Sequence, residues 1–323
     1  MFTAKKIIIA GGSGFIGQAM AQRWVADNEI IILSRQLPGE NNAYGTKVVG
    51  DKIRTVKWDG INMGEWAKYL NGADVLINLT GKSVNCRYNE ANKAEIFRSR
   101  LDATKVLGRA VNSVENPPKL WINAASATIY RHAEDRPQDE YTGEIENDFS
   151  VQVCKQWEQT FYDQHTPQTR KIALRTAITL GNGGVMIPYF NLAKFGLGGR
   201  QGSGRQMYSW VHIADVCRAV EYICENEAME GTYNVSAPNP VTNHVFMKTL
   251  RSTCGHLFGL PAFEWMLQIG TRLIGTEAEL ILKSRWVLPT RLTEAGFVFE
   301  FPELGMALKD IVRQVPRRRY HLF

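Results

Sequence analysis

The sequence predicts an α/β fold in which a doubly wound, mostly parallel sheet carries helices on both faces. Through residue 175, short apolar runs alternate with longer segments of helical periodicity. The runs, such as "KIIIA" at 6–10, lack the polar alternation of half-exposed strands, which is typical of parallel strands buried on both faces. After residue 180 the sequence pattern changes to one typical of glycine-rich loops and mixed helices. We therefore expect a first domain at 1–180 and a smaller α+β substrate lobe at 181–323.

Each expected element rests on a local pattern. Strands are expected where β-branched and other apolar residues cluster, at 5–10, 29–34, 55–58, 74–79, 120–124 and 171–175. Helices are expected where the apolar period lengthens to 3.6, at 15–26, 89–113 and 149–163. In the second part the same criteria predict helices at 185–194 and 212–224 and strands at 231–235 and, in "GFVFEF", at 296–301. Helix 212–224 and strand 231–235 either stay with the second lobe or pack back on the first domain.

Composition indicates a soluble globular protein without disulfides. With 323 residues and 44% hydrophobic content, the chain can bury a large core, and no apolar run approaches the roughly 20 residues of a membrane span. The five cysteines are scattered and form no CxxC pair, which argues against disulfides and zinc and favours the cytoplasm. The net charge of +6 is modest, and only the terminal run 317–319 is densely basic. We expect a monomer or homodimer that binds no nucleic acid.

A glycine-rich turn joins the first strand to the first helix. The turn, "GGSGFIG" at 11–17, fits GxGxxG in the strand-turn-helix context of a Rossmann dinucleotide-binding domain. Gly14 would let a pyrophosphate approach the backbone, and Gly17 would let the helix pack close to the strand. The helix N-terminus adds unpaired N–H groups and a positive dipole end. The residues expected at this cofactor site are Gly11, Gly12, Ser13, Gly14, Phe15, Ile16 and Gly17.

The ends of the following strands indicate which dinucleotide binds. An NAD site places a carboxylate at the end of the second strand, but here "LSRQ" supplies Ser34 and Arg35. An arginine pairs with phosphate through its fork of donors, so we expect NADP(H), with both side chains at the 2′-phosphate. A carboxylate after the third strand would accept from the adenine amine. The further residues expected to line the cofactor are Trp58, Asp59, Leu79, Thr80 and Gly81.

These motifs, with "SATIY" at 126–130 and "SWVHIADV" at 209–216, resemble the extended short-chain dehydrogenase/reductase superfamily. Within it, the chain is similar to the YfcH-like epimerase family, an NAD(P)-binding, nucleoside-diphosphate-sugar epimerase-like branch. The segments that carry this similarity are "RSRLDAT" (98–104), "VCKQWE" (153–158), "GLGGRQGSGRQMYSWVH" (196–212), "GTYNVSAPNPVT" (231–242) and "VLPTRLTEAGFVFEFPEL" (287–304). The resemblance covers nearly the whole chain and implies an NADP(H)-dependent oxidoreductase or epimerase acting on a small molecule.

The resemblance also implies a catalytic apparatus, of which one member is missing. The superfamily holds the substrate oxygen with Ser or Thr and moves its proton with Tyr. A Lys four residues later binds the nicotinamide ribose and lowers the phenol pKa. Ser126 matches the serine and Lys155 the lysine, but Val151 occupies the tyrosine position. An aliphatic side chain transfers no proton, so Tyr130, Cys154, an ordered water or the substrate itself would have to act.

Two functional classes remain open: an enzyme that works without the usual tyrosine, and a non-catalytic NADPH-binding sensor or regulatory protein. On the glycine-rich segment 196–206, which we expect to be mobile, Arg200 and Arg205 are candidates for contacting an anionic substrate. The segment lacks the Lys-Ser/Thr ending of an NTPase phosphate loop. His212 and Asp215 have no third ligand at a useful spacing, so we expect no metal site, and Asp215 is expected to hold its loop in place.

Overall fold

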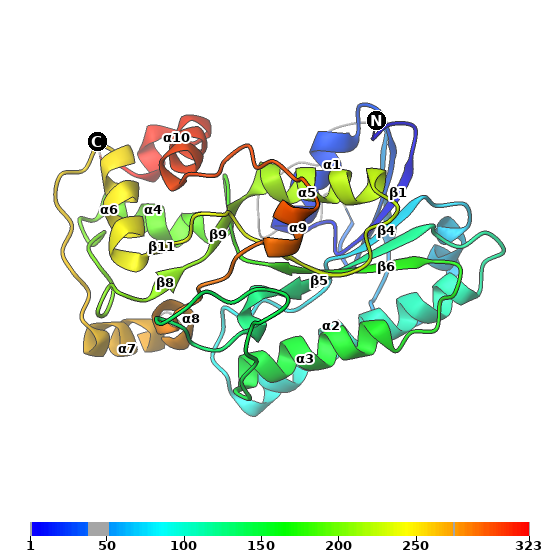
Figure 1. Ribbon diagram of the computed structural model, residues 1–323, viewed down its shortest axis with the longest axis horizontal. Helices are drawn as coiled ribbons and strands as arrows, with labels where there is room; N and C mark the ends of the chain where they lie inside the picture. The colour runs from blue at the N-terminus through cyan, green and yellow to red at the C-terminus, as the bar shows by residue number, and fades with distance from the viewer. Residues whose placement is uncertain (1, 38–51, 274, 323) are drawn as a thin grey trace.

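The computed structural model describes residues 2–37, 52–273 and 275–322, and its main feature is a seven-stranded parallel sheet (Figure 1). The strand order is β10-β6-β5-β4-β1-β2-β3, and every neighbouring pair is parallel. The strands are β1 (Lys6–Ala10), β2 (Glu29–Ser34), β3 (Ile53–Lys57), β4 (Val75–Asn78), β5 (Leu120–Ser126), β6 (Arg170–Thr176) and β10 (Gly231–Val235). The chain places β2 and β3 on one side of β1 and β4 on the other. Ligands of such sheets bind outside the carboxyl ends of the strands, at this reversal.

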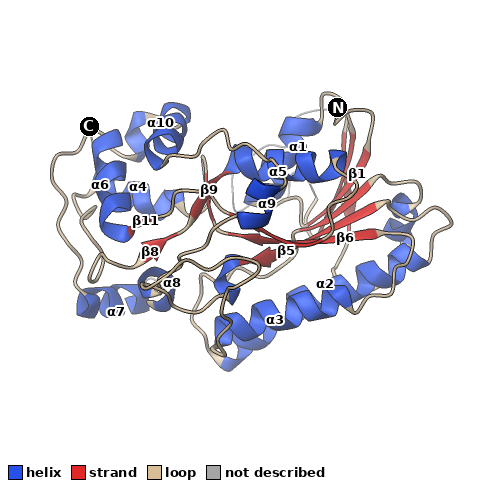
Figure 2. Ribbon diagram, viewed as in Figure 1, coloured by secondary structure: helices blue, strands red, loops and turns tan. Residues whose placement is uncertain are grey.

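Helices cover both faces of the sheet (Figure 2). Helices α1 (Phe15–Trp24) and α5 (Ile213–Glu225) pack on one face. The other face carries α2 (Glu90–Asn112), α3 (Phe149–Tyr162) and the short helix η1 (Glu65–Leu70). Because side chains alternate along a strand, the isoleucines of β1 enter both buried cores in turn. The prediction of a doubly wound α/β fold is confirmed.

The 23-residue helix α2 is long enough to cross a bilayer but is charged along its length. It begins where the Asn89 side chain accepts a hydrogen bond from the backbone N–H of Asn92, at 2.8 Å. Its buried stripe packs on the sheet and on α3. Within the described ranges, no helix combines the length and the apolar content that a membrane span requires.

A smaller lobe with its own core follows β6. Strand β7 (Ile178–Leu180) pairs in parallel with β9 (Trp210–His212), and β8 (Met207–Tyr208) pairs antiparallel with β11 (Val241–Thr242). The remaining elements are η2 (Ala127–Ile129), α4 (Met186–Lys194), α6 (Asn243–Thr253), α7 (Glu264–Leu273), α8 (Glu279–Leu282), α9 (Thr290–Glu294), α10 (Leu304–Gln314) and η3 (Arg317–Arg319). The lobe is not continuous in sequence, because α5 and β10 return to the layers of the main sheet.

The predicted strand at 296–301 is wrong. This segment is irregular, and its backbone N–H groups at Glu300 and Phe301 donate to the Asp215 carboxylate, at 2.8 and 2.9 Å. Asp215 is fully buried, and its oxygens accept the backbone hydrogen bonds that the carbonyl groups of a neighbouring strand would otherwise accept. The Phe297 side chain enters the core on the α5 face of the sheet. The aromatic pattern of the segment therefore reflects core packing and not sheet pairing.

Candidate nucleotide and substrate site

The glycine turn after β1 is so tight that two of its positions accept only glycine. Gly11 has a φ of +76°, and a Cβ there would stand 3.0 Å from the carbonyl carbon of Leu79. A Cβ on Gly17 would stand 2.5 Å from the Cα of Gly12, closer than real atoms approach. Helix α1 therefore begins in contact with the turn itself, and the turn touches the end of β4, where the strand order reverses.

Packing does not require a glycine at position 14. The φ of Gly14 is −79°, which suits any residue, and a Cβ there would meet only the carbonyl oxygen of Gly11, at 3.4 Å. Gly14 is the N-cap of α1 and supplies no side-chain bond to it. The first N–H groups of a helix have no partner within the helix, so an anion is well placed here. Gly14 thus leaves room where a pyrophosphate would approach.

The side chains of Phe15 and Ile16, which were expected at the cofactor, are used in packing. The Phe15 ring lies against the segment that links β7 to α4, and a Cβ on Gly181 would stand 2.8 Å from it. Ile16 packs against the core on the α1 face. Only the backbone N–H groups of these two residues remain for a phosphate. The Phe15 ring also ties the glycine turn to the second lobe.

The end of β2 carries the two residues expected at a 2′-phosphate. Ser34 is buried, and its hydroxyl donates to Ser13 Oγ at 3.0 Å, so Ser34 braces the glycine turn. Arg35 is exposed. The pKa of Glu95 on α2 is lowered, first by its hydrogen bond with Lys82 and also by the charge of Arg35. Arg35 therefore lies in a region that contains a second cation.

Trp58 and Asp59, after β3, differ in what they offer a ligand. Trp58 is 3% exposed and packs against Trp66, with ring centroids 5.3 Å apart, and together with Asp59 it lines a surface hollow of about 480 Å³. The Asp59 carboxylate is exposed and accepts from the backbone N–H groups of Ile61 and Asn62, at 2.8 and 2.9 Å. These backbone bonds lower the pKa of Asp59. A ligand could therefore donate a hydrogen bond only to the lone pairs of Asp59 that these backbone groups do not use.

A buried polar network fixes the end of β4. The Asn78 side chain donates to Asn123 Oδ1 at 2.7 Å and to Thr104 Oγ1 at 3.2 Å. Its own oxygen accepts from the backbone N–H of Thr80, at 3.1 Å. Leaving the buried Asn78 amide unpaired would cost about 1–3 kcal/mol. The network therefore stabilises the backbone conformation in which the chain leaves β4. Leu79 and Thr80 are thereby held partly buried beside the glycine turn, as predicted.

Arg100 on α2 lies over the same strand end, although it was not predicted as a site residue. A Cβ on Gly81 would stand 3.0 Å from the Arg100 Cζ. Arg100 Nη1 donates to the carbonyls of Lys82 and Ile96, at 3.1 and 2.9 Å. The guanidinium lies 5.1 Å from the centre of the Trp157 ring. Arg100 belongs to the segment 98–104 that supported the resemblance, but only the fold shows that it reaches this edge.

Helix α3 brings Cys154, and not Lys155, to Ser126 at the end of β5. The Cys154 thiol lies close to the Ser126 side chain, and burial raises the pKa of Cys154 to about 12. Lys155 is exposed on the solvent side of α3. In this structure the lysine predicted at the site faces solvent, whereas Cys154 faces Ser126. The buried residue one turn before Cys154 is Ser150, so the site has neither a phenol nor an ammonium at this pair of positions.

Tyr130 is a core residue whose hydroxyl is already bonded. It is 1% exposed, donates to Asn234 Oδ1 at 3.0 Å and accepts from Arg175 Nη1 at 2.9 Å. Burial raises the pKa of Tyr130. Arg175 also pairs with Glu158 on α3, through bonds of 2.8 and 2.7 Å. Because its one proton is directed to Asn234, the geometry does not support Tyr130 as the missing acid.

The segment 196–206 is bonded to its surroundings. The backbone N–H of Gly202 donates to the carbonyl of Ala262, at 2.8 Å. Arg200 donates to the carbonyls of Gly202 and Ser203, at 3.1 and 3.0 Å, and Arg205 is exposed. Arg200 is therefore committed to its own loop, which does not favour its predicted contact with a substrate.

His212 and Asp215 stabilise the second lobe. His212 Nδ1 accepts from the backbone N–H of Ala214 at 3.2 Å and so caps α5, and burial lowers the pKa of His212. Asp215 holds the segment 296–301 and also accepts from Arg218 Nη1, at 2.8 Å. Among the residues with a described placement, no group of three or more His, Cys, Asp or Glu side chains is arranged to hold a metal ion.

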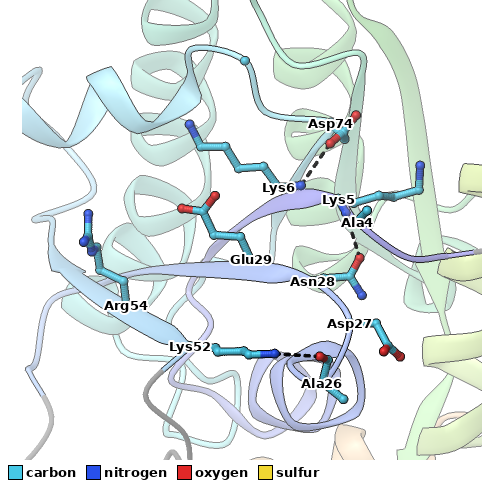
Figure 3. Close-up of a pocket in the computed structure, with 11 residues that line it drawn as sticks. Ala4, Lys5, Lys6, Ala26, Asp27, Asn28, Glu29, Lys52, Arg54 and Asp74 are labelled. Carbon is cyan, nitrogen blue, oxygen red and sulfur yellow. Dashed lines mark hydrogen bonds between the residues drawn. The ribbon is translucent and has the colours of Figure 1, made fainter.

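A surface hollow of about 760 Å³ lies at the opposite edge of the sheet (Figure 3). It is lined by residues at the amino ends of the strands, among them Lys6, Glu29, Arg54 and Asp74. The Asp74 carboxylate accepts a hydrogen bond from the backbone N–H of Lys6 at 2.9 Å. Part of the polar lining of the hollow therefore already bonds the backbone at this edge of the sheet. Since ligands of parallel sheets bind at the carboxyl ends, we do not assign the nucleotide to this hollow.

The chain is similar to known proteins over almost its whole length. The sequence profile of the NAD dependent epimerase/dehydratase family matches residues 7–236, and that of a domain of unknown function, DUF1731, matches residues 262–311. Epimerase family protein SSP1921 of Staphylococcus saprophyticus is 31% identical over 311 residues, 95% of this chain and 99% of the relative. Human epimerase family protein SDR39U1 is 29% identical over 314 residues, with the same two coverages.

Solved structures agree with the sequence comparison. The crystal structure of human SDR39U1 (isoform 2) with NADPH superposes with a TM-score of 0.82 and 29% identity, covering 96% of this chain and 99% of that chain. A UDP-N-acetylglucosamine 4-epimerase from Methanobrevibacter ruminantium, at 17% identity and a TM-score of 0.75 over 96% of this chain and 98% of that chain, shares the fold. The resemblance inferred from the motifs is confirmed, and the chain belongs to the NAD dependent epimerase/dehydratase family.

Proposed function

We propose that this protein binds NADP(H) and acts as an oxidoreductase or epimerase-like enzyme on a small molecule. The observation that carries the proposal is the open position at Gly14, at the head of α1, with Arg35 exposed at the end of β2. The pyrophosphate would accept from the first N–H groups of α1, and the 2′-phosphate would lie beside Arg35. The NADPH complex of human SDR39U1, 29% identical to this chain, supports the choice of cofactor.

The remaining strand ends complete this cofactor site. Leu79, Thr80 and Gly81 would line the dinucleotide between the glycine turn and Ser126, and Asp59 would accept from the adenine amine. All five cysteines, each in a described range, are free, which supports a reducing compartment such as the cytoplasm. The partner in this proposal is a small-molecule substrate and not a nucleic acid or a membrane.

The nicotinamide would supply hydride transfer, while the protein orients the substrate and manages its proton. Ser126 Oγ accepts from the backbone N–H of Thr128 at 3.2 Å, which fixes the hydroxyl that would hold a substrate oxygen. Tyr130 is bonded elsewhere and Lys155 faces solvent, so neither supplies a proton at this point. We assign that proton to an ordered water or to the substrate itself.

A non-catalytic NADPH-binding protein is the second candidate function. The bonded hydroxyl of Tyr130 and the solvent-facing Lys155 favour this function as well. A site with no phenol and no ammonium at the expected positions lacks the usual means of moving a proton. In that case occupancy of the cofactor site would shift the equilibrium between arrangements of the two lobes. The Phe15 ring, which contacts the segment between β7 and α4, would transmit the change.

The two functions are separated by measuring NADPH binding and NADPH turnover on the same preparation. The screen uses aldehydes, ketones and nucleoside-diphosphate sugars, with Ser126→Ala as the matched variant. An enzyme oxidises NADPH above the buffer rate with at least one substrate, and Ser126→Ala lowers that rate about 100-fold or more without changing NADPH affinity. A sensor binds NADPH with no turnover in either protein. Absence of NADPH binding refutes both functions.

A further inference from the structure

Two arginines reach Cys154 from separate elements. Arg100 comes from α2, and Arg285 comes from the segment that follows α8. Both guanidinium groups lie within electrostatic range of Cys154, whose thiol lies close to Ser126, and Glu279 lies within range of Arg285. Arg100, Arg285, Ser126, Cys154 and Glu279 form one polar group, the arginine cluster. The cluster adjoins the nucleotide edge, because Arg100 also covers Gly81.

The backbone around Arg285 is fixed. Its N–H donates to the carbonyl of Met207 at 2.8 Å, and its own carbonyl accepts from the N–H and the hydroxyl of Ser209, at 3.0 and 2.8 Å. Arg100 is held by two carbonyls and by the face of Trp157. The Arg100 guanidinium and the Arg285 backbone are therefore ordered before a ligand arrives, which reduces the entropic cost of binding.

Several polar atoms of the arginine cluster lack partners. Arg285 Nε and Nη1 are buried, and neither has a hydrogen-bond partner in the described part of the chain; the same holds for Glu279 Oε1. Buried N–H groups in native proteins are nearly always paired. Burial also lowers the pKa of Arg285 to about 10, as expected for a cation removed from water. The site thus presents guanidinium donors that await oxygen acceptors.

The neighbouring carboxylates do not fill this need. Glu279, Asp148 and Glu146 all lie within electrostatic range of Arg285. Lys283 bonds Asp148 and lies 3.9 Å from Glu279 and 4.0 Å from Glu146. The Asp148 and Glu146 side chains are 33% and 47% exposed, so water screens them, whereas the Lys283 side chain is 8% exposed. The Glu279 side chain is 34% exposed, although its Oε1 atom is buried. The buried inner part of the cluster is therefore cationic.

We propose that the arginine cluster binds an anionic oxyacid group of the substrate, a carboxylate or a phosphate. Arg285 is the main donor and Arg100 the second cation. A guanidinium fork matches two oxygens of either group, and Glu279 Oε1 can accept from a hydroxyl next to it. The proposal rests on the proposed function, because it takes Ser126 as the point where the reacting oxygen is held. The sequence predicted that Arg200 and Arg205 contact an anionic substrate, and this proposal assigns that contact to Arg285 and Arg100 instead.

The test titrates inorganic phosphate and malonate into NADPH-saturated protein at constant ionic strength, followed by calorimetry. Arg285→Gln is the test variant, and Arg200→Gln is the control, since it removes the same charge from an exposed arginine. At least one anion binds the native protein saturably. Arg285→Gln weakens that binding about tenfold or more, and Arg200→Gln changes it by less than about twofold. The anion that binds more tightly identifies the class of substrate.

Further variants keep the outcome decisive. Arg285→Lys retains the charge without the fork and gives an intermediate loss, which stands in for Arg285→Gln if that variant fails to fold. Unchanged NADPH affinity shows that a variant is folded. If NADPH does not bind the native protein, the proposed function fails, and the cluster is then tested without NADPH by comparing Arg285→Gln with the same control, Arg200→Gln. The proposal is overturned if neither anion binds the native protein, or if a control variant loses as much affinity as Arg285→Gln.

Discussion

The substitution Gly14→Ala separates cofactor binding from folding. The backbone at Gly14 suits alanine, and the added methyl would meet only one atom, the Gly11 carbonyl oxygen at 3.4 Å, which is an ordinary contact. Alanine gains about 0.4–1 kcal/mol through the unfolded chain and loses roughly 0.5–1 kcal/mol relative to glycine at an N-cap, so stability changes by less than about 1 kcal/mol. The methyl stands where a pyrophosphate would approach the α1 N–H groups. Loss of one such charge-assisted bond costs about 1.5–3 kcal/mol, which raises the Kd for NADPH roughly 10- to 150-fold.

Two measurements on the same protein check this expectation. Urea denaturation gives the free energy of unfolding, and calorimetric titration gives the Kd for NADPH. The expected result is native stability with strongly weakened binding. Native affinity in a folded Gly14→Ala protein would refute the placement of the pyrophosphate at the head of α1. A large loss of stability would refute the claim that packing leaves this position open.

Three further predictions concern the packing and charges around the site. Gly17→Ala forces a backbone shift, since its Cβ would stand 2.5 Å from backbone, and lowers stability by about 1–3 kcal/mol or more in urea denaturation; an unchanged midpoint contradicts it. Glu158→Ala leaves the largely buried Arg175 guanidinium without its carboxylate partner and costs about 3–5 kcal/mol, while a loss below about 1 kcal/mol would show that water reaches the pair. Burial raises the pKa of Cys154 and Cys217 to about 12 from an unfolded value near 9, so the folded state keeps protons that the unfolded state releases. Their contribution to stability is complete below about pH 9 and is lost as the pH rises toward 12, by at most about 1.4 kcal/mol per pH unit for each thiol. Thermal unfolding at about pH 7, 9 and 10.5 should show this slope, and a Cys154→Ala, Cys217→Ala double variant should reduce it without abolishing it, because burial also raises the pKa of Cys224 and Cys254 to about 12.

The sheet and the glycine turn could be predicted from the sequence because their causes are local. The run at 30–33 is apolar without interruption, and the structure begins and ends β2 at the expected residues, 29 and 34. The roles of Gly11 and Gly17 follow from a turn of seven residues, and the structure gives each a close backbone contact. Patterns within one segment carry this information without reference to the rest of the fold.

The substrate side of the site could not be predicted because it depends on contacts between distant segments. Counting from Ser126 placed Lys155 at the site, but the packing of α3 turns Cys154 inward instead. A count along a loop cannot fix the rotation of the helix that follows it. Arg285 lies 131 positions beyond Cys154, and the segment 296–301 lacks the strand predicted for it because a carboxylate from α5 binds its backbone.

The assignment of NADP(H) as the cofactor depends most directly on Arg35, and a comparison of the affinities for NADPH and NADH tests it. Calorimetry on the native protein should give NADPH the lower Kd by about tenfold or more, the value of one charge-assisted contact to the 2′-phosphate. Arg35→Gln should remove this preference and leave the Kd for NADH unchanged. Arg54→Gln, which removes an arginine at the opposite edge of the sheet, should keep it. Equal affinity of the native protein for the two dinucleotides, or no binding of either, would contradict the account.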